Sequence, residues 1–149
     1  MRESIGSTWL YGIVLAFILL FSAFLSIAIH YSRVFKIKNE SLSILEKYEG
    51  YNSTSREIIN QYFKATGYNA TGKCPDTTYY GETSLNNTGS SILNATSRDK
   101  YYYCIKENNQ GGFEIILFFK VDLPIVGDIA TMRINGETKP IRYKNTILK

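Results

Sequence analysis

The chain has 149 residues, with 17 Lys and Arg against 13 Asp and Glu, a formal net charge of +4 and a pI near 9.0. This length accommodates one modest domain together with a membrane anchor, and it excludes a second hydrophobic core. The cations are scattered and form no clustered basic patch, so the composition argues against a nucleic-acid partner.

The first predicted element is an uncharged apolar stretch of 21 residues from Trp9 to Ile29. A helix of that length covers roughly 32 Å, which matches a hydrocarbon core about 30 Å thick. Tyr11 joins Trp9 at one end, and His30 and Tyr31 lie at the other, where an interfacial aromatic belt is expected. A cleaved signal peptide has a shorter apolar core and a small-residue cleavage site, so we predict an uncleaved signal anchor in a single-pass membrane protein.

Two features of the sequence predict opposite sides of the membrane for residues 33–149. Before the span stands Arg2, and after it stand Arg33, Lys36, Lys38 and Lys47, which by the positive-inside rule indicates a cytoplasmic domain. The only cysteines, Cys74 and Cys104, could form one bridge, and disulfides persist mainly in oxidising compartments. We expect residues 1–32 to be a short tail with the transmembrane helix, and residues 33–149 to be an extracytoplasmic domain.

Beyond the span, the sequence keeps a helical periodicity. A spacing of three and four residues relates Val34, Ile37, Ser41, Ile44 and Tyr48. We therefore predict that the membrane helix continues unbroken to about residue 48 as an amphipathic stalk. The stripe is too short to predict a coiled coil, so we expect the domain's own sheet to bury it.

A second short helix follows, after Gly50 and Asn52 end the stalk. Thr54 and Glu57 have capping-box spacing, and Gly67 supplies a C-terminal stop.

Residues 67–100 are rich in Gly, Asn, Ser and Thr and poor in large apolar residues. This composition predicts a long surface loop with at most a short strand or turn. A bridge between Cys74 and Cys104 would close about 31 residues and contribute about 3 to 4 kcal/mol in the chain-entropy model. Two free buried thiols are the alternative, which a cytoplasmic location would require.

In the last third of the chain, the alternation of apolar residues and the positions of turn residues predict antiparallel strands. Residues 101–107 form the first, and a turn at Gly111 and Gly112 leads to residues 113–123. One face of this second strand is wholly apolar and is expected to pack on the stalk helix, namely Phe113, Ile115, Leu117, Phe119 and Val121.

A turn at "PIVG" then precedes the strand "DIATMRI", and Asn135-Gly136 is the strongest hairpin signal in the chain. We predict that "ETKPIRYKN" completes this hairpin, with Pro140 marking an edge strand. The expected fold class is α+β, with a three- or four-stranded antiparallel sheet.

This order of elements resembles the type IV pilin-like architecture. The segment "VDLPIVGDIATMRINGETKPI" resembles the C-terminal hairpin region of small TadE-like pseudopilins and similar single-pass proteins of Gram-positive gut bacteria. Their pattern is a hydrophobic strand, a Pro and Gly turn and a closing I-x-G-x-(S/T) segment, which Ile134, Gly136 and Thr138 match. The layout covers nearly the whole chain, and the motif covers about twenty residues.

The resemblance implies an assembly subunit whose N-terminal helix packs against other pilin-like subunits in the bilayer. Pilin-like precursors carry a Gly or Ala processing site and a Glu at the fifth mature position. Here Gly6 is followed by Ser7, Thr8, Trp9, Leu10 and Tyr11, so the resemblance does not extend to that site.

No catalytic, cofactor-binding or metal-ligating residue is predicted. The single histidine, His30, lies at the membrane border, away from any nucleophile of the polar part. Two cysteines without a second pair do not indicate a metal site. Five N-x-S/T sequons would be glycan sites in a eukaryotic secretory protein, and we interpret them as chance in an Asn-rich bacterial sequence: Asn39, Asn52, Asn69, Asn86 and Asn94.

We therefore expect a non-enzymatic bitopic membrane protein, a structural or accessory subunit of a pilin-like or secretion-related surface assembly. Its partners would be the lipid bilayer and other pilin-like subunits, with no nucleic acid and no small-molecule ligand identified. The alternative is a membrane-tethered extracytoplasmic binding or sensing module that acts alone, with the loop at 67–100 and its tyrosines as the recognition surface.

Overall fold

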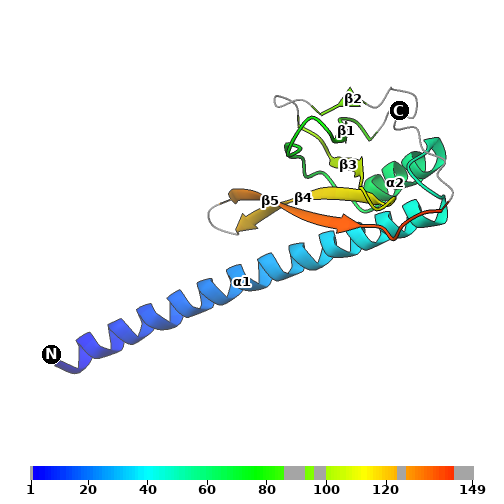
Figure 1. Cartoon of the computed structure of the whole chain (residues 1–149). Coiled ribbons are helices and arrows are strands. Elements are labelled where there is room, and N and C mark those ends of the chain that lie inside the picture. Colours follow the sequence, from blue (N-terminus) through cyan, green and yellow to red (C-terminus); the bar gives the residue numbers. More distant parts are fainter. Residues whose placement is uncertain (1, 86–92, 96–99, 124–126, 143–149) are drawn as a thin grey trace.

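The computed structural model describes residues 2–85, 93–95, 100–123 and 127–142. Figure 1 shows a long helix whose N-terminal half projects away from a compact domain made of a second helix and a sheet. The elements are α1 (Arg2–Lys47), α2 (Ser53–Ala65), β1 (Tyr80–Glu82), β2 (Leu93–Asn94), β3 (Tyr103–Glu107), β4 (Phe113–Leu123) and β5 (Gly127–Glu137). The α+β class is confirmed.

The helix α1 runs for 46 residues without a proline, a length of about 69 Å. It ends in a Schellman motif, in which the Gly50 N–H donates to the Leu45 carbonyl (2.9 Å) and the Glu49 N–H donates to the Glu46 carbonyl (3.3 Å). Glu49 takes the left-handed conformation of this motif, with φ of 56°. The predicted membrane helix and the predicted stalk are therefore one continuous helix.

The second helix, α2, ends with the same motif around Gly67. The Gly67 N–H donates to the Lys64 carbonyl (3.0 Å) and the Tyr68 N–H donates to the Phe63 carbonyl (2.9 Å). Gly67 has φ of 67°, which glycine adopts without the steric cost that a Cβ adds. The predicted C-terminal stop lies at this residue.

The N-terminal cap of α2 differs from the prediction. Asn52, and not Thr54, is the N-cap: the Ser55 N–H donates to Asn52 Oδ1, and the Asn52 N–H donates to Ser55 Oγ, both at 2.9 Å. Glu57 plays no part in this capping box. An Asn caps at least as well as a Thr, so the helix begins at the earlier of the two candidate pairs.

Within the described residues, the antiparallel sheet has the strand order β2-β1-β3-β4-β5, one strand more than the three or four predicted. The long strands β4 and β5 form a hairpin whose register runs from Glu114 opposite Glu137 to Leu123 opposite Gly127, with a bulge at Val121 and Asp122. The predicted turn at "PIVG" begins with residues 124–126, which lie outside the described residues.

The predicted hairpin at Asn135-Gly136 is wrong. Both residues lie inside β5, where Asn135 pairs with Ile116 and Gly136 pairs with Ile115. A Cβ on Gly136 would lie 2.9 Å from side-chain atoms of Lys38 and Leu42, so this glycine permits close approach of α1 to the strand.

No strand follows β5 among the residues the structure describes, so the Pro140 segment is not the expected edge strand. Instead, the Thr138 N–H donates to the Phe113 carbonyl (2.9 Å) and the Ile141 N–H donates to the Gly111 carbonyl (3.1 Å). The chain therefore continues past the start of β4 alongside the β3–β4 turn, and β5 itself is the edge of the sheet among the described strands.

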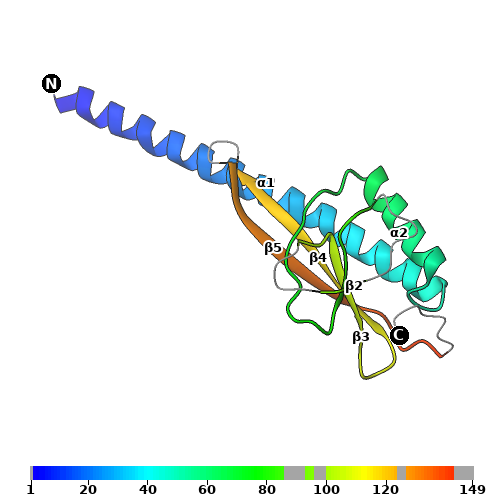
Figure 2. The same ribbon diagram turned by 90° about the horizontal axis from the view of Figure 1, so that it is seen from above.

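The helices cover one face of the sheet, as Figure 2 shows for the hairpin that lies along α1. Opposite residues of an antiparallel pair share a face, so Ile115 and its partner Gly136 both face α1. The apolar face predicted for β4 is this face, and its residues Phe113, Ile115, Leu117 and Phe119 are all buried. The side chain of Val121 is outside the description.

The segment 67–85 is not the surface loop that its composition indicated. It contributes β1 to the sheet, and it buries Tyr68, Ala70, Tyr79 and Leu85. The Tyr68 hydroxyl accepts a hydrogen bond from the Phe118 N–H (2.8 Å), just beyond the point where β3 stops pairing with β4. The prediction of a surface loop failed because of the tyrosines in this segment. One tyrosine ring buries as much surface as several small residues, and its hydroxyl can form a hydrogen bond with a buried backbone group. Residues 86–92 and 96–99 of the predicted loop lie outside the described residues.

Candidate functional site

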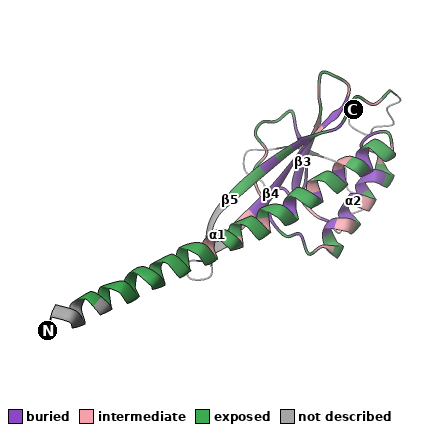
Figure 3. Ribbon diagram, turned by 90° about the horizontal axis from the view of Figure 1, so that it is seen from below, coloured by how far each residue is buried: buried purple, intermediate pink, exposed green. Residues whose placement is uncertain are grey.

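The most unusual surface of the molecule is the apolar N-terminal half of α1. Figure 3 shows this half exposed along its length, while the C-terminal half is buried where it meets the domain. Trp9 is 73% exposed, Leu20 71% and Phe24 63%. A soluble monomer rarely exposes a contiguous apolar patch of more than a few hundred Å², so such a surface marks contact with a membrane or another protein.

The segment Thr8–Lys47 contains a stretch long and apolar enough to cross a membrane by length and composition. Both predicted ends of the span, Trp9 and Ile29, are exposed on this part of α1. Three side chains near the C-terminal end of this segment are only partly exposed: Ala23, Ser26 and His30. They are spaced three and four residues apart, so they lie on the same helix face as the stalk stripe that begins at Val34.

The predicted stalk stripe lies on the sheet. Val34, Ile37 and Ile44 are buried, and Tyr48 is half-buried against the core. Ser41, at the polar position of this stripe, is buried too and donates its hydroxyl hydrogen bond to the Ile37 carbonyl (2.8 Å). At the membrane end of the stripe, the ring of Tyr31 meets the ring of Phe119 edge to face, with 6.1 Å between centroids.

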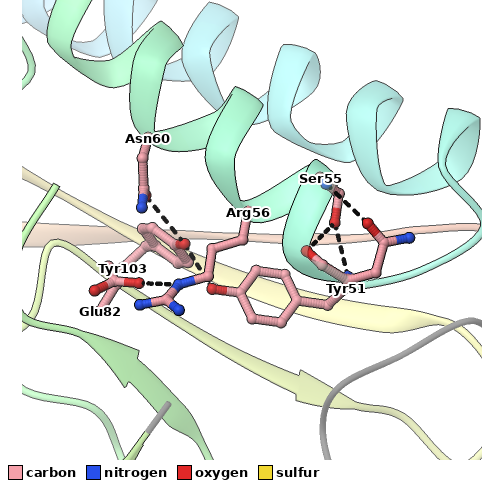
Figure 4. A network of polar contacts seen from close by, with 7 residues as sticks. Tyr51, Ser55, Arg56, Asn60, Glu82 and Tyr103 are labelled. Atoms are coloured by element: carbon pink, nitrogen blue, oxygen red, sulfur yellow. Dashed lines mark hydrogen bonds and ion pairs between the residues drawn. The ribbon is translucent and has the colours of Figure 1, made fainter. Parts of the chain in front are cut away.

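A buried polar cluster joins α2 to the sheet (Figure 4). Arg56 Nε donates to Glu82 Oε2 at 2.5 Å, and these two side chains are only 7% and 4% exposed. Nearby, the hydroxyls of Tyr51 and Tyr103 are 2.7 Å apart, and the Tyr103 hydroxyl donates to Asn60 Oδ1 at 3.3 Å. Three elements, α2, β1 and β3, and the segment between the two helices thus meet through polar groups inside an otherwise apolar core.

The electrostatics of this cluster follow from its burial. Desolvation raises the pKa of the Tyr51 and Tyr103 phenols well above the ordinary value, so both are neutral. Burial opposes the charge of Arg56, but the hydrogen bond that Arg56 donates to Glu82 and the negative charge of Glu82 together outweigh burial and raise the pKa of the guanidinium. Asn60 Nδ2 is buried without a hydrogen-bond partner among the residues described.

Sequence reasoning missed this cluster. Arg56 and Asn60 lie four residues apart, on the helix face that also carries the buried Ile59 and Phe63. A charged residue inside an apolar stripe is a signal for a buried partner, but that partner, Glu82, is distant in sequence. Both charged side chains are almost fully buried, so the cluster holds α2 on the sheet from inside the core.

The two cysteines form a disulfide, with 5.8 Å between their Cα atoms. Cys104 lies in β3 and is fully buried, while Cys74 lies in the segment before β1. The bond therefore ties this segment to the sheet on the face opposite the helices, where Cys104 is paired with Ile116.

Among the described residues, no group of three or more His, Cys, Asp or Glu side chains is placed to hold a metal ion. The three residues of the I-x-G-x-(S/T) segment all have structural roles: Ile134 is buried, Gly136 lies against α1, and Thr138 Oγ1 accepts the Phe113 N–H (2.8 Å).

Comparison of the chain with protein-family models, with curated proteins and with solved structures finds no match.

Proposed function

We propose that this chain is a bitopic membrane protein without enzymatic activity, which serves as a structural or accessory subunit of a pilin-like or secretion-related surface assembly. The transmembrane part of α1 anchors it and packs against neighbouring subunits. The domain of residues 33–149 lies on the extracytoplasmic side.

The observation that carries this proposal is the continuity of α1. One helix supplies both the exposed apolar segment and the buried stalk, so no flexible hinge separates anchor and domain. A helix that crosses the bilayer as a rigid extension of the domain fixes the height and tilt of that domain above the membrane. A tethered module that acts alone has no need of such rigidity, whereas subunits that pack side by side do.

The disulfide supports the extracytoplasmic side. A bond between Cys74 and Cys104 persists where the environment is oxidising, and it is reduced in most cytoplasms. The disulfide is a stronger indication of topology than the number of cations beyond the span, because individual charges next to a span can also bind lipid headgroups.

Topology is tested by labelling intact cells with a membrane-impermeant maleimide. The variant Gln61→Cys places a thiol on the exposed side of α2, and Gly6→Cys places one at the other end of the span. We expect labelling of Gln61→Cys in intact cells and of Gly6→Cys only after lysis. The reverse pattern would contradict the proposed location and remove the support for a surface assembly.

Assembly is tested by crosslinking within the membrane. Single cysteines are introduced along the exposed half of α1, for example Ala16→Cys to Leu20→Cys, and membranes are treated with a mild oxidant. Packed subunits should give disulfide-linked dimers at positions that recur every three to four residues, because only one helix face meets a neighbour. Absence of dimers at every position would favour the lone tethered module.

A further inference from the structure

A groove at the membrane border of α1 combines apolar and cationic walls. Its cavity has a volume of about 620 Å³ and lies between α1 and the C-terminal end of α2. Figure 3 shows these two helices side by side. On α1 the lining begins with apolar residues and continues with Ser32 and two cations before a last apolar residue, in the order Leu25, Ala28, Ile29, Ser32, Arg33, Lys36 and Ile37.

The depth of these residues is set by the helix rise. If the hydrocarbon region ends near Ile29, then Arg33 and Lys36 lie about 6 Å and 10 Å beyond it. The headgroup layer on each side of a bilayer is about 5 to 8 Å thick, so both cations stand at or just above the level of lipid phosphates. The apolar part of the same groove lies at the level of the upper acyl chains.

A second cavity, of about 310 Å³, adjoins the first and shares Arg33 and Ile37 with it. Its lining adds two more basic side chains, His30 from α1 and Lys120 from β4. No Asp or Glu of the described residues lines either cavity. Basic residues from two elements thus surround the same point at the membrane border.

The C-terminus of a helix would repel an anion through its free carbonyls, but that of α2 is capped. The Tyr62 and Phe63 carbonyls accept hydrogen bonds from the Thr66 N–H and the Tyr68 N–H, at 3.0 and 2.9 Å. Thr66 Oγ1 donates to the Tyr62 carbonyl as well (2.9 Å). The pKa of Tyr62, which lines the groove, is raised by burial and, to a smaller extent, by the negative charge of Glu40. Glu40 is one turn beyond Lys36 and therefore farther from the membrane.

We infer that this groove binds one anionic phospholipid, with the phosphate held by Arg33 and Lys36 and an acyl chain lying along Leu25, Ala28 and Ile29. The inference rests on the proposed function in one respect, since it requires α1 to span the bilayer. It also gives Arg33 and Lys36 a role that is independent of topology, which resolves their conflict with the disulfide.

The test uses the full chain in detergent micelles, with lipid retention measured by native mass spectrometry. Dioleoyl phosphatidylglycerol and dioleoyl phosphatidylcholine are added separately, because they differ in net charge and not in acyl chains. The wild-type chain should retain one phosphatidylglycerol and little phosphatidylcholine. In Arg33→Gln/Lys36→Gln, affinity for phosphatidylglycerol should fall roughly 30-fold, since each Lys or Arg near an anionic surface contributes about a factor of five.

Two further variants separate a local site from a general charge effect. Lys47→Gln/Lys139→Gln removes two exposed cations far from the groove and should bind phosphatidylglycerol as the wild type does. Arg33→Lys/Lys36→Arg conserves the charges and should retain most of the binding. Near-UV circular dichroism checks that each variant is folded.

The inference is overturned if the wild type retains both lipids equally, or if Arg33→Gln/Lys36→Gln binds phosphatidylglycerol undiminished. Displacement of the lipid by excess inorganic phosphate would show a phosphate-ion site and would also overturn it. Extraction of the wild-type chain from membranes by alkaline carbonate would instead contradict the span itself. That result removes the proposed function, whereas a spanning chain without lipid preference removes only this inference.

Discussion

The two halves of α1 share one helical backbone and have opposite surroundings. Residues 8–29 are apolar on every side and mostly exposed, whereas in residues 33–48 the buried side chains follow helical spacing and most of the other positions are charged or polar. The difference shows that total hydrophobicity does not draw a helix into a protein core. Periodicity decides this, because a sheet can cover only one face of a helix, and a uniformly apolar segment needs an apolar solvent.

The largest effect is expected for the buried ion pair that holds α2 on the packed side of the molecule. Glu82→Gln leaves the charge of Arg56 buried without its partner, which should lower the free energy of unfolding by about 3–5 kcal/mol. The measurement is denaturant unfolding of the full chain in detergent, followed by the near-UV circular dichroism of the tyrosines. The sole tryptophan, Trp9, lies in the exposed half of α1 and reports on that half separately.

A matched control is Glu114→Gln, which breaks the pair with Lys106 (3.3 Å), whose side chains are 31% and 15% exposed. This more exposed pair should cost no more than about 1 kcal/mol. Equal costs for the two variants would contradict the role given to the buried pair.

The contrast between the two halves of α1 is tested directly by a pair of identical substitutions. Ile37→Ala removes a side chain that is 2% exposed and should destabilise the domain by about 2–5 kcal/mol. Ile18→Ala, at a position that is 56% exposed, should leave the unfolding of the domain unchanged. If both variants unfold alike, the apolar half contributes to the domain core and the comparison fails.

Membrane insertion should depend on the apolar half of α1 and not on the packed half. Leu20→Arg places a charge near the centre of the span, at a cost of about 2.5–3.5 kcal/mol for insertion. We expect a larger fraction of this variant in the carbonate-extractable pool. Ser43→Arg, on the exposed side of the packed half, serves as the control and should remain in the membrane fraction.

Alkaline pH should affect the packed half through its buried phenols. The pKa values of Tyr51 and Tyr103 are raised from the ordinary 10.0, so their contribution to stability is complete below pH 10 and is lost as the pH rises toward their folded values. Each phenol contributes a slope of about 1.4 kcal/mol per pH unit above its unfolded pKa. In Tyr103→Phe, this slope should decrease by that amount in unfolding measurements above pH 10, whatever the stability lost at neutral pH. An unchanged slope would mean that Tyr103 ionises freely in the folded chain.

The smallest effect concerns the end of the stalk. Glu49 adopts the left-handed conformation that Gly67 adopts at the end of α2. Glu49→Gly should therefore raise the free energy of unfolding by about 1 kcal/mol, and Gly67→Ala should lower it by a similar amount. A loss of stability in Glu49→Gly would indicate that the Glu49 side chain makes a contact worth more than the backbone strain.

Several features of the fold could be read from local residues. The apolar run, the stalk stripe ending near Tyr48 and the stop at Gly67 depend on neighbours within one helix, and the alternating face of β4 depends on neighbours within one strand. The error at Asn135-Gly136 has the opposite origin. An Asn-Gly dipeptide forms a hairpin turn only when the segments before and after it pair with each other as strands. Here both residues pair with β4 instead, and the missing side chain of Gly136 lets α1 pack closely against β5.

The candidate site divides in the same way. The exposed apolar half of α1 was predictable, because an uncharged apolar run of this length is typical of a helix surrounded by lipid. The groove at the membrane border and the pair of Arg56 with Glu82 were not, since each joins residues from separate elements.

By itself, the sequence determined that this protein has an apolar helix long enough to span a bilayer, a continuous stalk and an antiparallel sheet, because each follows from a periodicity of a few residues. Only the tertiary structure decided that residues 67–85 pack into the core, that β5 is the edge of the sheet and that α1 and α2 together line the groove that contains Arg33 and Lys36. These features arise from contacts between distant segments, and a contact of that kind is selected by the packing of the whole core.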